Sequence, residues 1–155
     1  MKQTGFSFVE LLVVLAMLAS LAAIAVPPIQ HAMQRQREAQ LRNALHEIRS
    51  AIDAYKRARE RGQIKRAPGV SLYPPDLQTL VDGVPDQQSP DRRMLRFLRQ
   101  LPRDPFADPD WPAASTWAQR ASTSPPDVWD EGDDVFDVAS RSSLTGLNGV
   151  PLAQW

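Results

Sequence analysis

The most constraining feature of this sequence is a continuous apolar run near its start. The 21 residues from Phe6 to Val26 contain a single charged side chain, Glu10. The only other polar side chains in the run are Ser7 and Ser20. A run of about 18 or more apolar residues is long enough to cross a bilayer as a helix. We therefore expect this segment to form a transmembrane helix.

Glu10 is out of place in such a helix. An ionised side chain in a membrane helix costs about 2.5–3.5 kcal/mol even on permissive insertion scales. No Lys, Arg or His lies between Phe6 and Gln30 to pair with it. Cleavage between Gly5 and Phe6 would supply a cation, because the new terminal amine would lie on Phe6. Positions four apart share a helix face, so that amine can pair with its own Glu10 or with Glu10 of a neighbour.

Two simpler interpretations of the apolar run are a secretory signal peptide and a plain signal anchor. A cleaved signal peptide ends in small residues, and Ala22-Ala23-Ile24-Ala25 loosely fits such a site. Neither interpretation explains Glu10, and the run is long for a secretory signal.

The residues around Glu10 also resemble a known processing signal. Gly5-Phe6-Ser7-Phe8-Val9-Glu10, preceded by Lys2 and followed by the apolar run, is similar to the motif of type IV pilins and type II secretion pseudopilins. The resemblance implies that a prepilin peptidase cuts after Gly5 and that Phe6 becomes the N-methylated terminus. It also implies that Glu10 is the carboxylate used in filament assembly.

Later segments resemble the major pseudopilin of type II secretion systems. They are Tyr73-Pro74-Pro75 and Leu101-Pro102-Arg103-Asp104-Pro105-Phe106. The resemblance implies an α+β, type IV pilin-like fold, in which a long N-terminal helix packs against a small globular head with a short antiparallel sheet. It also implies a single-pass protein of the bacterial inner membrane with its head in the periplasm, where the assembled filament lies.

The implied partners are other copies of the chain, other pseudopilins, prepilin peptidase and an inner-membrane assembly platform. A type IV pilin for adhesion, motility or DNA uptake is the alternative within this class. A signal-anchored periplasmic binding protein is the alternative from another class.

We expect four parts: a leader at residues 1–5, a transmembrane and assembly helix at 6–27, its amphipathic continuation at 28–62 and a periplasmic head at 63–155. Pro27 and Pro28 end the apolar run, since each lacks an N–H and clashes with the preceding turn. We expect a kink there, with the helix continuing beyond it. An apolar stripe with intervals of three and four supports the continuation: Leu41, Ala44, Leu45, Ile48, Ala51, Ile52 and Tyr55.

The opposite face of that helix is basic, and we expect it to be solvated. It carries Arg35, Arg42, Arg49, Lys56 and Arg59, without interleaved aromatic residues, so we do not expect a nucleic-acid site. Overall charge is zero, but residues 31–66 carry ten basic and four acidic residues, whereas residues 101–155 carry three and nine. This asymmetry can favour head-to-tail contacts between copies.

In the head, the pattern predicts few regular elements. Residues 75–81 are expected to form a short helix, residues 82–91 a loop, and residues 92–101 a short helix or extended segment. Alternation at 135–138 predicts a strand, paired in an antiparallel sheet with a strand near 116–118.

Acidic residues cluster between Asp127 and Asp137. Calcium binds six to eight oxygens, often on a loop, so Asp130, Asp133, Asp134 and Asp137 are candidate calcium ligands and calcium is the one cofactor that the sequence suggests. We favour a solvated acidic loop, because the run lacks a recognisable calcium-binding loop.

His31 and His46 are expected to be surface residues of the helix. The absence of cysteine excludes disulfides and thiol catalysis, and no catalytic motif indicates an enzyme.

Overall fold

The computed structural model describes residues 7–126 and 128–155, and for residues 22–31 it describes the backbone alone. A single helix, α1 (Phe8–Glu60), accounts for the first part of the chain. Residues 1–36 and 37–155 form two units, and each is described by itself. Helix α1 includes Pro27 and Pro28, so the helix continues past the prolines as predicted. The kink at these prolines stays a prediction.

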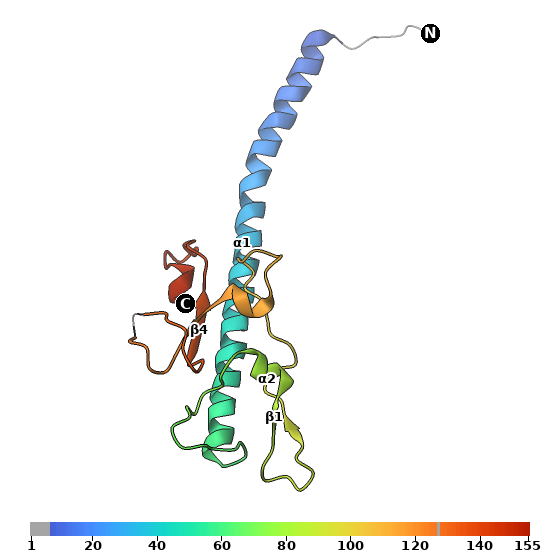
Figure 1. The fold of residues 1–155 in the computed structure, drawn as a ribbon. Coiled ribbons are helices and arrows are strands. Elements are labelled where there is room, and N and C mark those ends of the chain that lie inside the picture. The colour runs from blue at the N-terminus through green and yellow to red at the C-terminus, as the bar shows by residue number, and fades with distance from the viewer. Residues whose placement is uncertain (1–6, 127) are drawn as a thin grey trace. The chain divides into compact units, whose positions relative to one another are not determined.

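The second unit is an α+β head built on the C-terminal half of α1 (Figure 1). After α1 come the short helix α2 (Gln78–Asp82) and the strands β1 (Val84–Pro85) and β2 (Met94–Leu95). The strands β3 (Trp117–Arg120) and β4 (Asp137–Ser140) follow, together with two 3₁₀ turns, η1 (Ala113–Thr116) and η2 (Leu152–Gln154). In the view of Figure 1, α2 and β1 lie on one side of this part of α1, and β4 and the C-terminus lie on the other.

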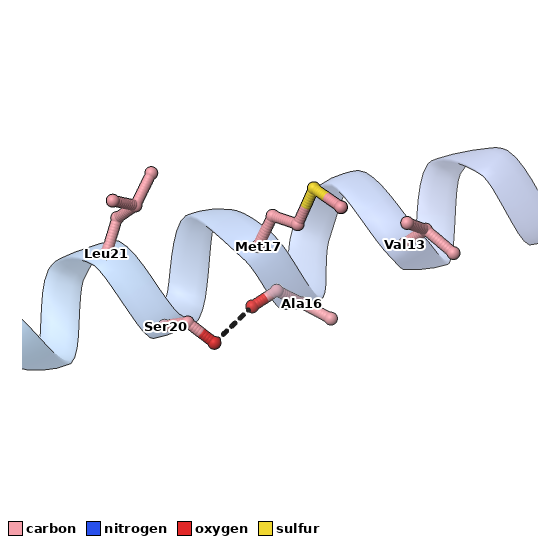
Figure 2. Close-up of a pocket in the computed structure, with 5 residues that line it drawn as sticks. All are labelled: Val13, Ala16, Met17, Ser20 and Leu21. Carbon is pink, nitrogen blue, oxygen red and sulfur yellow. Dashed lines mark hydrogen bonds between the residues drawn. The ribbon is translucent and has the colours of Figure 1, made fainter.

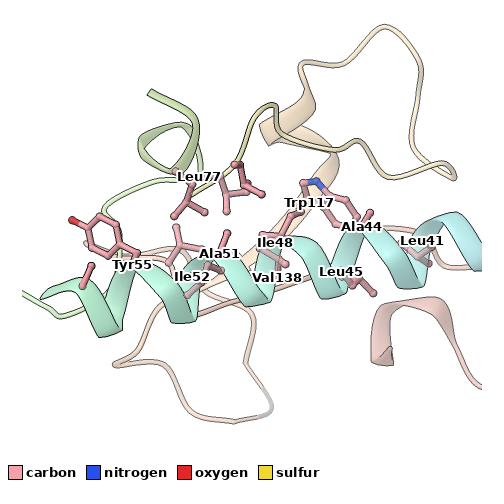
Figure 3. Packing of buried hydrophobic residues seen from close by; sticks show 14 of the residues in the cluster. Leu41, Ala44, Leu45, Ile48, Ala51, Ile52, Tyr55, Leu77, Trp117 and Val138 are labelled. Atoms are coloured by element: carbon pink, nitrogen blue, oxygen red, sulfur yellow. The ribbon is translucent and has the colours of Figure 1, made fainter. Parts of the chain in front are cut away.

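The core of the head forms along the apolar stripe of α1. All seven predicted stripe residues are buried, and Ile48 is completely inaccessible to solvent. Figure 3 shows Leu77, Trp117 and Val138 facing the stripe from segments distant in sequence. The stripe is buried because positions three and four apart lie on one face of a helix and therefore meet the same covering elements.

The β3–β4 pair confirms the predicted antiparallel sheet with a shift in its bounds. Trp117 pairs with Ser140, and Arg120 pairs with Asp137. The strand expected at 135–138 therefore begins two residues later, at Asp137. The partner strand begins at Trp117, and we expected it near residues 116–118.

The structure corrects the prediction of a plain loop at residues 82–91. Strands β1 and β2 form a two-stranded antiparallel sheet in which Val84 pairs with Leu95. Gly83 precedes β1 with φ of 83°, a left-handed conformation that side chains disfavour. A Cβ at this position would lie 2.6 Å from the Leu95 carbonyl oxygen. Pro85 is itself a residue of β1, since a short edge strand tolerates proline.

The structure also corrects the prediction that the basic face of α1 is wholly solvated. Arg59 is buried, and Arg49 is partly buried against the head. Arg49 donates to the backbone oxygens of Val138 at 2.9 Å and Trp155 at 2.8 Å. β4 and the C-terminal residues cover this part of the helix, which the periodicity of α1 alone does not reveal. His46 is exposed as predicted, and the side chain of His31 lies outside the described residues.

Candidate assembly site

The N-terminal part of α1 presents apolar side chains that pack against nothing in the described part of its own unit. Phe8 is 75% exposed, and the long apolar side chains that follow are also exposed: Val9, Leu11, Leu12, Val13, Val14, Leu15, Met17, Leu18 and Leu21. Monomeric soluble proteins rarely expose a contiguous apolar surface of this kind, because burying it is favourable. The surface is therefore a site for a partner or for lipid.

Glu10 lies in the first turn of α1 and is exposed. A carboxylate is favourable at a helix N-terminus, because the unpaired N–H groups of the first turn carry partial positive charge. Val13 and Met17 follow Glu10 by three and seven residues, so the three side chains share one helix face. The only titratable group between Phe8 and Leu21 is therefore at the start of an apolar face.

An open hollow of about 520 Å³ lies on this surface, one turn after Glu10. Figure 2 shows the residues that line it: Val13, Ala16, Met17, Ser20 and Leu21. Ser20 donates its hydroxyl to the Ala16 carbonyl oxygen at 3.0 Å, so its polar atom is satisfied within the helix. The small side chains of Ala16 and Ser20 leave a groove between their larger neighbours. A ridge of side chains on another helix can pack into such a groove.

Other predicted residues of this site cannot be placed. Gly5 and Phe6, the predicted cleavage and methylation positions, lie outside the described residues, and so does the contact between the Phe6 amine and Glu10. The side chains of Pro27 and Pro28 are also outside the description. Among the residues that the structure describes, no helix is both long and apolar enough to count as a candidate membrane span.

The candidate calcium ligands in the head are not brought together. Asp134 is buried and Asp137 is partly buried, whereas Asp130 and Asp133 are exposed. Asp137 accepts from Arg49 Nε at 2.8 Å and faces Arg120 Nη2 at 3.5 Å. Within residues 7–126 and 128–155, no three acidic or histidine side chains converge as a metal site would require. Calcium binding stays a prediction without support from these contacts.

Asp134 instead joins two loops of the head. Its carboxylate accepts from the Ser122 amide at 2.7 Å and the Ser122 hydroxyl at 2.6 Å, and it also accepts from the Ser71 hydroxyl. Burial alone would raise the pKa of this carboxyl, but the hydrogen bonds from Ser122 and Ser71 outweigh burial and leave the pKa lowered. The acidic run is therefore not uniformly solvated, contrary to the interpretation that we favoured from the sequence.

Sequence reasoning missed a second buried acid, Asp104, in the segment that resembles the major pseudopilin. Its carboxylate accepts from the Ser140 hydroxyl at 2.5 Å and from the Phe106 amide at 2.8 Å. The nearby Pro102 carbonyl oxygen accepts from the Trp117 indole at 2.9 Å. These bonds tie the segment to both strands of the β3–β4 sheet. Nothing in the Asp-Pro sequence showed that the carboxylate is buried.

One family model matches the chain, and it covers the segment that contains Glu10. Residues 1–26 match the prokaryotic N-terminal methylation motif, which is 26 of the 155 residues. This motif is a type IV pilin-like signal, and it indicates prepilin peptidase processing, N-terminal methylation and assembly with pilin-like partners. No curated protein matches the chain, and no solved structure does.

Proposed function

We propose that this chain is a pseudopilin, a structural subunit of a type II secretion system that is closest to the major pseudopilin. It is cleaved after Gly5, methylated on Phe6 and assembled through its N-terminal helix into a periplasmic filament that drives protein export. Its role is structural rather than catalytic. The observation that carries the proposal is the exposed apolar face of α1 with Glu10 in its first turn, inside the segment that matches the methylation motif.

The energetics of this face explain why cleavage would lead to assembly. In the uncleaved chain, Glu10 has no cation within the apolar run, so a membrane environment would penalise its charge. Cleavage after Gly5 creates a terminal amine, and methylation leaves that amine charged. Pairing Glu10 with the amine of a neighbouring copy removes the penalty and fixes the register of the two helices. Packing of the apolar faces then supplies the bulk of the association energy.

The location follows from the same segment. The proposal places residues 6–27 in the bacterial inner membrane as a single-pass anchor before assembly, with Lys2 on the cytoplasmic side and the head in the periplasm. A positive residue before a span favours that orientation. The inner-membrane assembly platform and the other pseudopilins would be partners during filament growth.

Replacement of the carboxylate tests the proposal. Glu10→Ala should leave cleavage by prepilin peptidase intact and abolish assembly, because the neighbouring amine loses its partner. Glu47→Ala is the matched control, since Glu47 is an exposed acid in the head-covered part of α1. Cleavage is measured by intact mass, and assembly by recovery of sheared filaments. Filaments of normal yield from Glu10→Ala would contradict the proposal.

A deletion strain separates the secretion machine from a pilus. Loss of protein export on deletion would support the pseudopilin assignment, whereas loss of twitching motility, adhesion or DNA uptake would support a type IV pilin. A chain that keeps its leader and stays monomeric would instead support a signal-anchored binding protein.

A further inference from the structure

One end of the head is formed by two segments that are tied together. The turn after α1, at residues 61–66, and the tip of the β1–β2 hairpin, at residues 86–93, lie at the same end of the head (Figure 1). The Gln87 amide donates to the Gln63 carbonyl oxygen at 2.7 Å, and the Gln88 side chain donates to the Arg61 carbonyl oxygen at 2.6 Å. The two segments therefore form one surface, which we call the basic end.

The basic end has a surplus of positive charge when every charged residue is counted. Its two acids are Asp86 and Asp91. Its five basic residues, all of them exposed, are Arg61, Lys65, Arg66, Arg92 and Arg93. The surplus remains when the flanking residues are included, since residues 53–99 carry ten basic and six acidic residues.

The basic side chains at this end are free, unlike two other arginines of the head. Arg49 and Arg120 both pair with Asp137. The five side chains of the basic end form no hydrogen bond or ion pair within the described part of the chain. Their charge is therefore available to a partner that reaches the surface from solvent.

The backbone at Arg92 is strained. Among the described residues, Arg92 is the one non-glycine residue with a positive φ, which is 47°. Glycine or asparagine is favoured in this left-handed conformation, because a longer side chain disfavours it. The turn is closed by the Arg92 amide, which donates to the Ser89 carbonyl oxygen at 3.0 Å. A solvated surface does not explain an arginine here, whereas a role for its guanidinium group does.

We propose that the basic end binds the acidic loop at residues 130–133 of a second copy of this chain. Asp130, Glu131 and Asp133 are exposed. Glu131 pairs with Arg141 of its own head at 3.0 Å, but the carboxylates of Asp130 and Asp133 have no partner within the described part of the chain. Free carboxylates on one copy thus match free guanidinium groups on the other, and hydrogen bonds between such groups are among the stronger ones in proteins.

The acidic loop is held in place on both sides. The Ala121 amide and the Ser124 hydroxyl donate to the Asp130 carbonyl oxygen at 3.0 Å and 3.1 Å. After the loop, the buried Asp134 carboxylate accepts from the Ser122 hydroxyl at 2.6 Å. A pre-organised loop loses little conformational entropy on docking.

The charges within one head do not satisfy these two surfaces. Among the described residues, no ion pair joins the acidic loop to the basic end of the same chain. The other exposed acidic loop, at residues 107–111, is a poorer match. The Arg103 guanidinium donates to the backbone oxygens of Asp108 and Pro109, both at 2.9 Å, and offsets part of the charge of that loop.

The basic end and the acidic loop are different surfaces of the head, so the contact between copies is heterologous. Such contacts extend into helical assemblies when the rotation does not close a ring. The inference deepens the proposed function and rests on it, because it assigns a head-to-head contact to the filament.

Charge reversal with rescue tests the contact. Arg92→Glu combined with Arg93→Glu should lower the yield of sheared filaments about fivefold, because like charges then face each other. Addition of Asp130→Arg and Asp133→Arg to this variant should restore the yield. An unchanged yield after the first reversal, or no restoration after the second, would overturn the inference.

A matched control separates a specific contact from a change in net charge. Glu47 and Asp53 are exposed acids of α1 that lie outside both surfaces. Glu47→Arg with Asp53→Arg, added to the variant reversed at Arg92 and Arg93, restores the same net charge and should not restore the filament yield. Equal restoration by the control pair would overturn the inference.

Crosslinking identifies the occupant of the basic end. The chain has no cysteine, so Gln87→Cys and Val128→Cys place thiols beside the two surfaces at exposed, uncharged positions. A short bismaleimide should give ladders of linked subunits in isolated filaments of this variant. Gln87→Cys with Ser115→Cys, another exposed position, should give none. Filaments of the first variant without ladders would assign the basic end to another anionic partner, such as lipid headgroups, and overturn the self-contact.

The inference and the proposed function fail in different ways. Methylated Phe6 and the dependence of filaments on Glu10 test the proposed function without involving either surface of the head. Filaments that depend on Glu10 but do not respond to charge reversal would overturn the inference alone. The absence of filaments would overturn both, because the contact forms between assembled copies.

Discussion

The two parts of α1 are equally helical and differ in what covers their apolar faces. From Phe8 to Leu21 the long apolar side chains are exposed in the described structure, whereas from Leu41 to Tyr55 the stripe residues are buried by the head. The later part finds its partners within the chain: Leu77, Trp117 and Val138. Among the described residues of its own unit, the earlier part has no such partners. We infer that its stability in the cell depends on other molecules, first lipid and then neighbouring copies.

The largest effect on folding is expected in the head-covered part. Ile48→Ala should destabilise the head by about 2–5 kcal/mol, because it removes methyl groups from a fully buried site and leaves a cavity. Urea unfolding of the full chain in detergent, followed by near-UV circular dichroism, measures the loss. A change below about 1 kcal/mol would show that the stripe contributes little to the core.

A smaller loss is expected at the buried carboxylate of Asp104. Asp104→Ala leaves the Ser140 hydroxyl and the Phe106 amide without their acceptor, which should cost about 1–3 kcal/mol. Asp91→Ala is the matched control for stability, because Asp91 is exposed, and it should change unfolding by less than about 0.5 kcal/mol. Equal losses in the two variants would show that the buried bonds do not stabilise the head.

Asp134 should contribute stability that depends on pH. Its pKa in the folded head is lowered, so its contribution is present above the ordinary Asp value of 3.8 and is lost as the pH falls through the folded value. Asp134→Asn should therefore be less stable than the parent chain at pH 7, and the gap should narrow below pH 3.8. Urea unfolding across this range measures the gap. Asp133→Asn, at an exposed site, is the matched control and should change stability at pH 7 by less than about 0.5 kcal/mol.

The smallest effect on the isolated chain is expected in the exposed part of α1. Met17→Ala removes a side chain from the hollow next to Ser20, yet it should change the unfolding of the head by less than about 0.5 kcal/mol. The same substitution should reduce filament yield, because the side chain would pack only against another copy. Reduced head stability together with a normal filament yield would contradict the assignment of Met17 to contacts between copies.

The sequence predicted the periodic parts of this fold well. The stripe from Leu41 to Tyr55 and the short helix near Leu80 follow from helical spacing, since the apolar positions must meet a covering surface. The antiparallel pairing of β3 with β4 was predicted to within about two residues. A short alternating run indicates that a strand is present more reliably than it indicates where the strand begins and ends. The motif around Glu10 was recognised by its resemblance to the type IV pilin-like processing signal, and the family match over residues 1–26 confirms that resemblance.

The sequence did not predict which polar residues the head would bury. Arg49 was assigned to a solvated face because helical periodicity describes one element and not the strand that covers it. Asp104 and Asp134 lie in loops, where a carboxylate can be solvated or buried, and the outcome depends on Ser140 and Ser122 from distant segments. The β1–β2 pair was missed because two-residue strands have no period to detect.

The most direct test of the account is the intact mass of the protein isolated from membranes of cells with and without prepilin peptidase. We expect a mature chain that has lost residues 1–5 and gained one methyl group on Phe6, and the full-length chain when the peptidase is absent. A chain that starts at Met1 in both strains, or one that starts after Ala25, would contradict the account and remove the role assigned to Glu10.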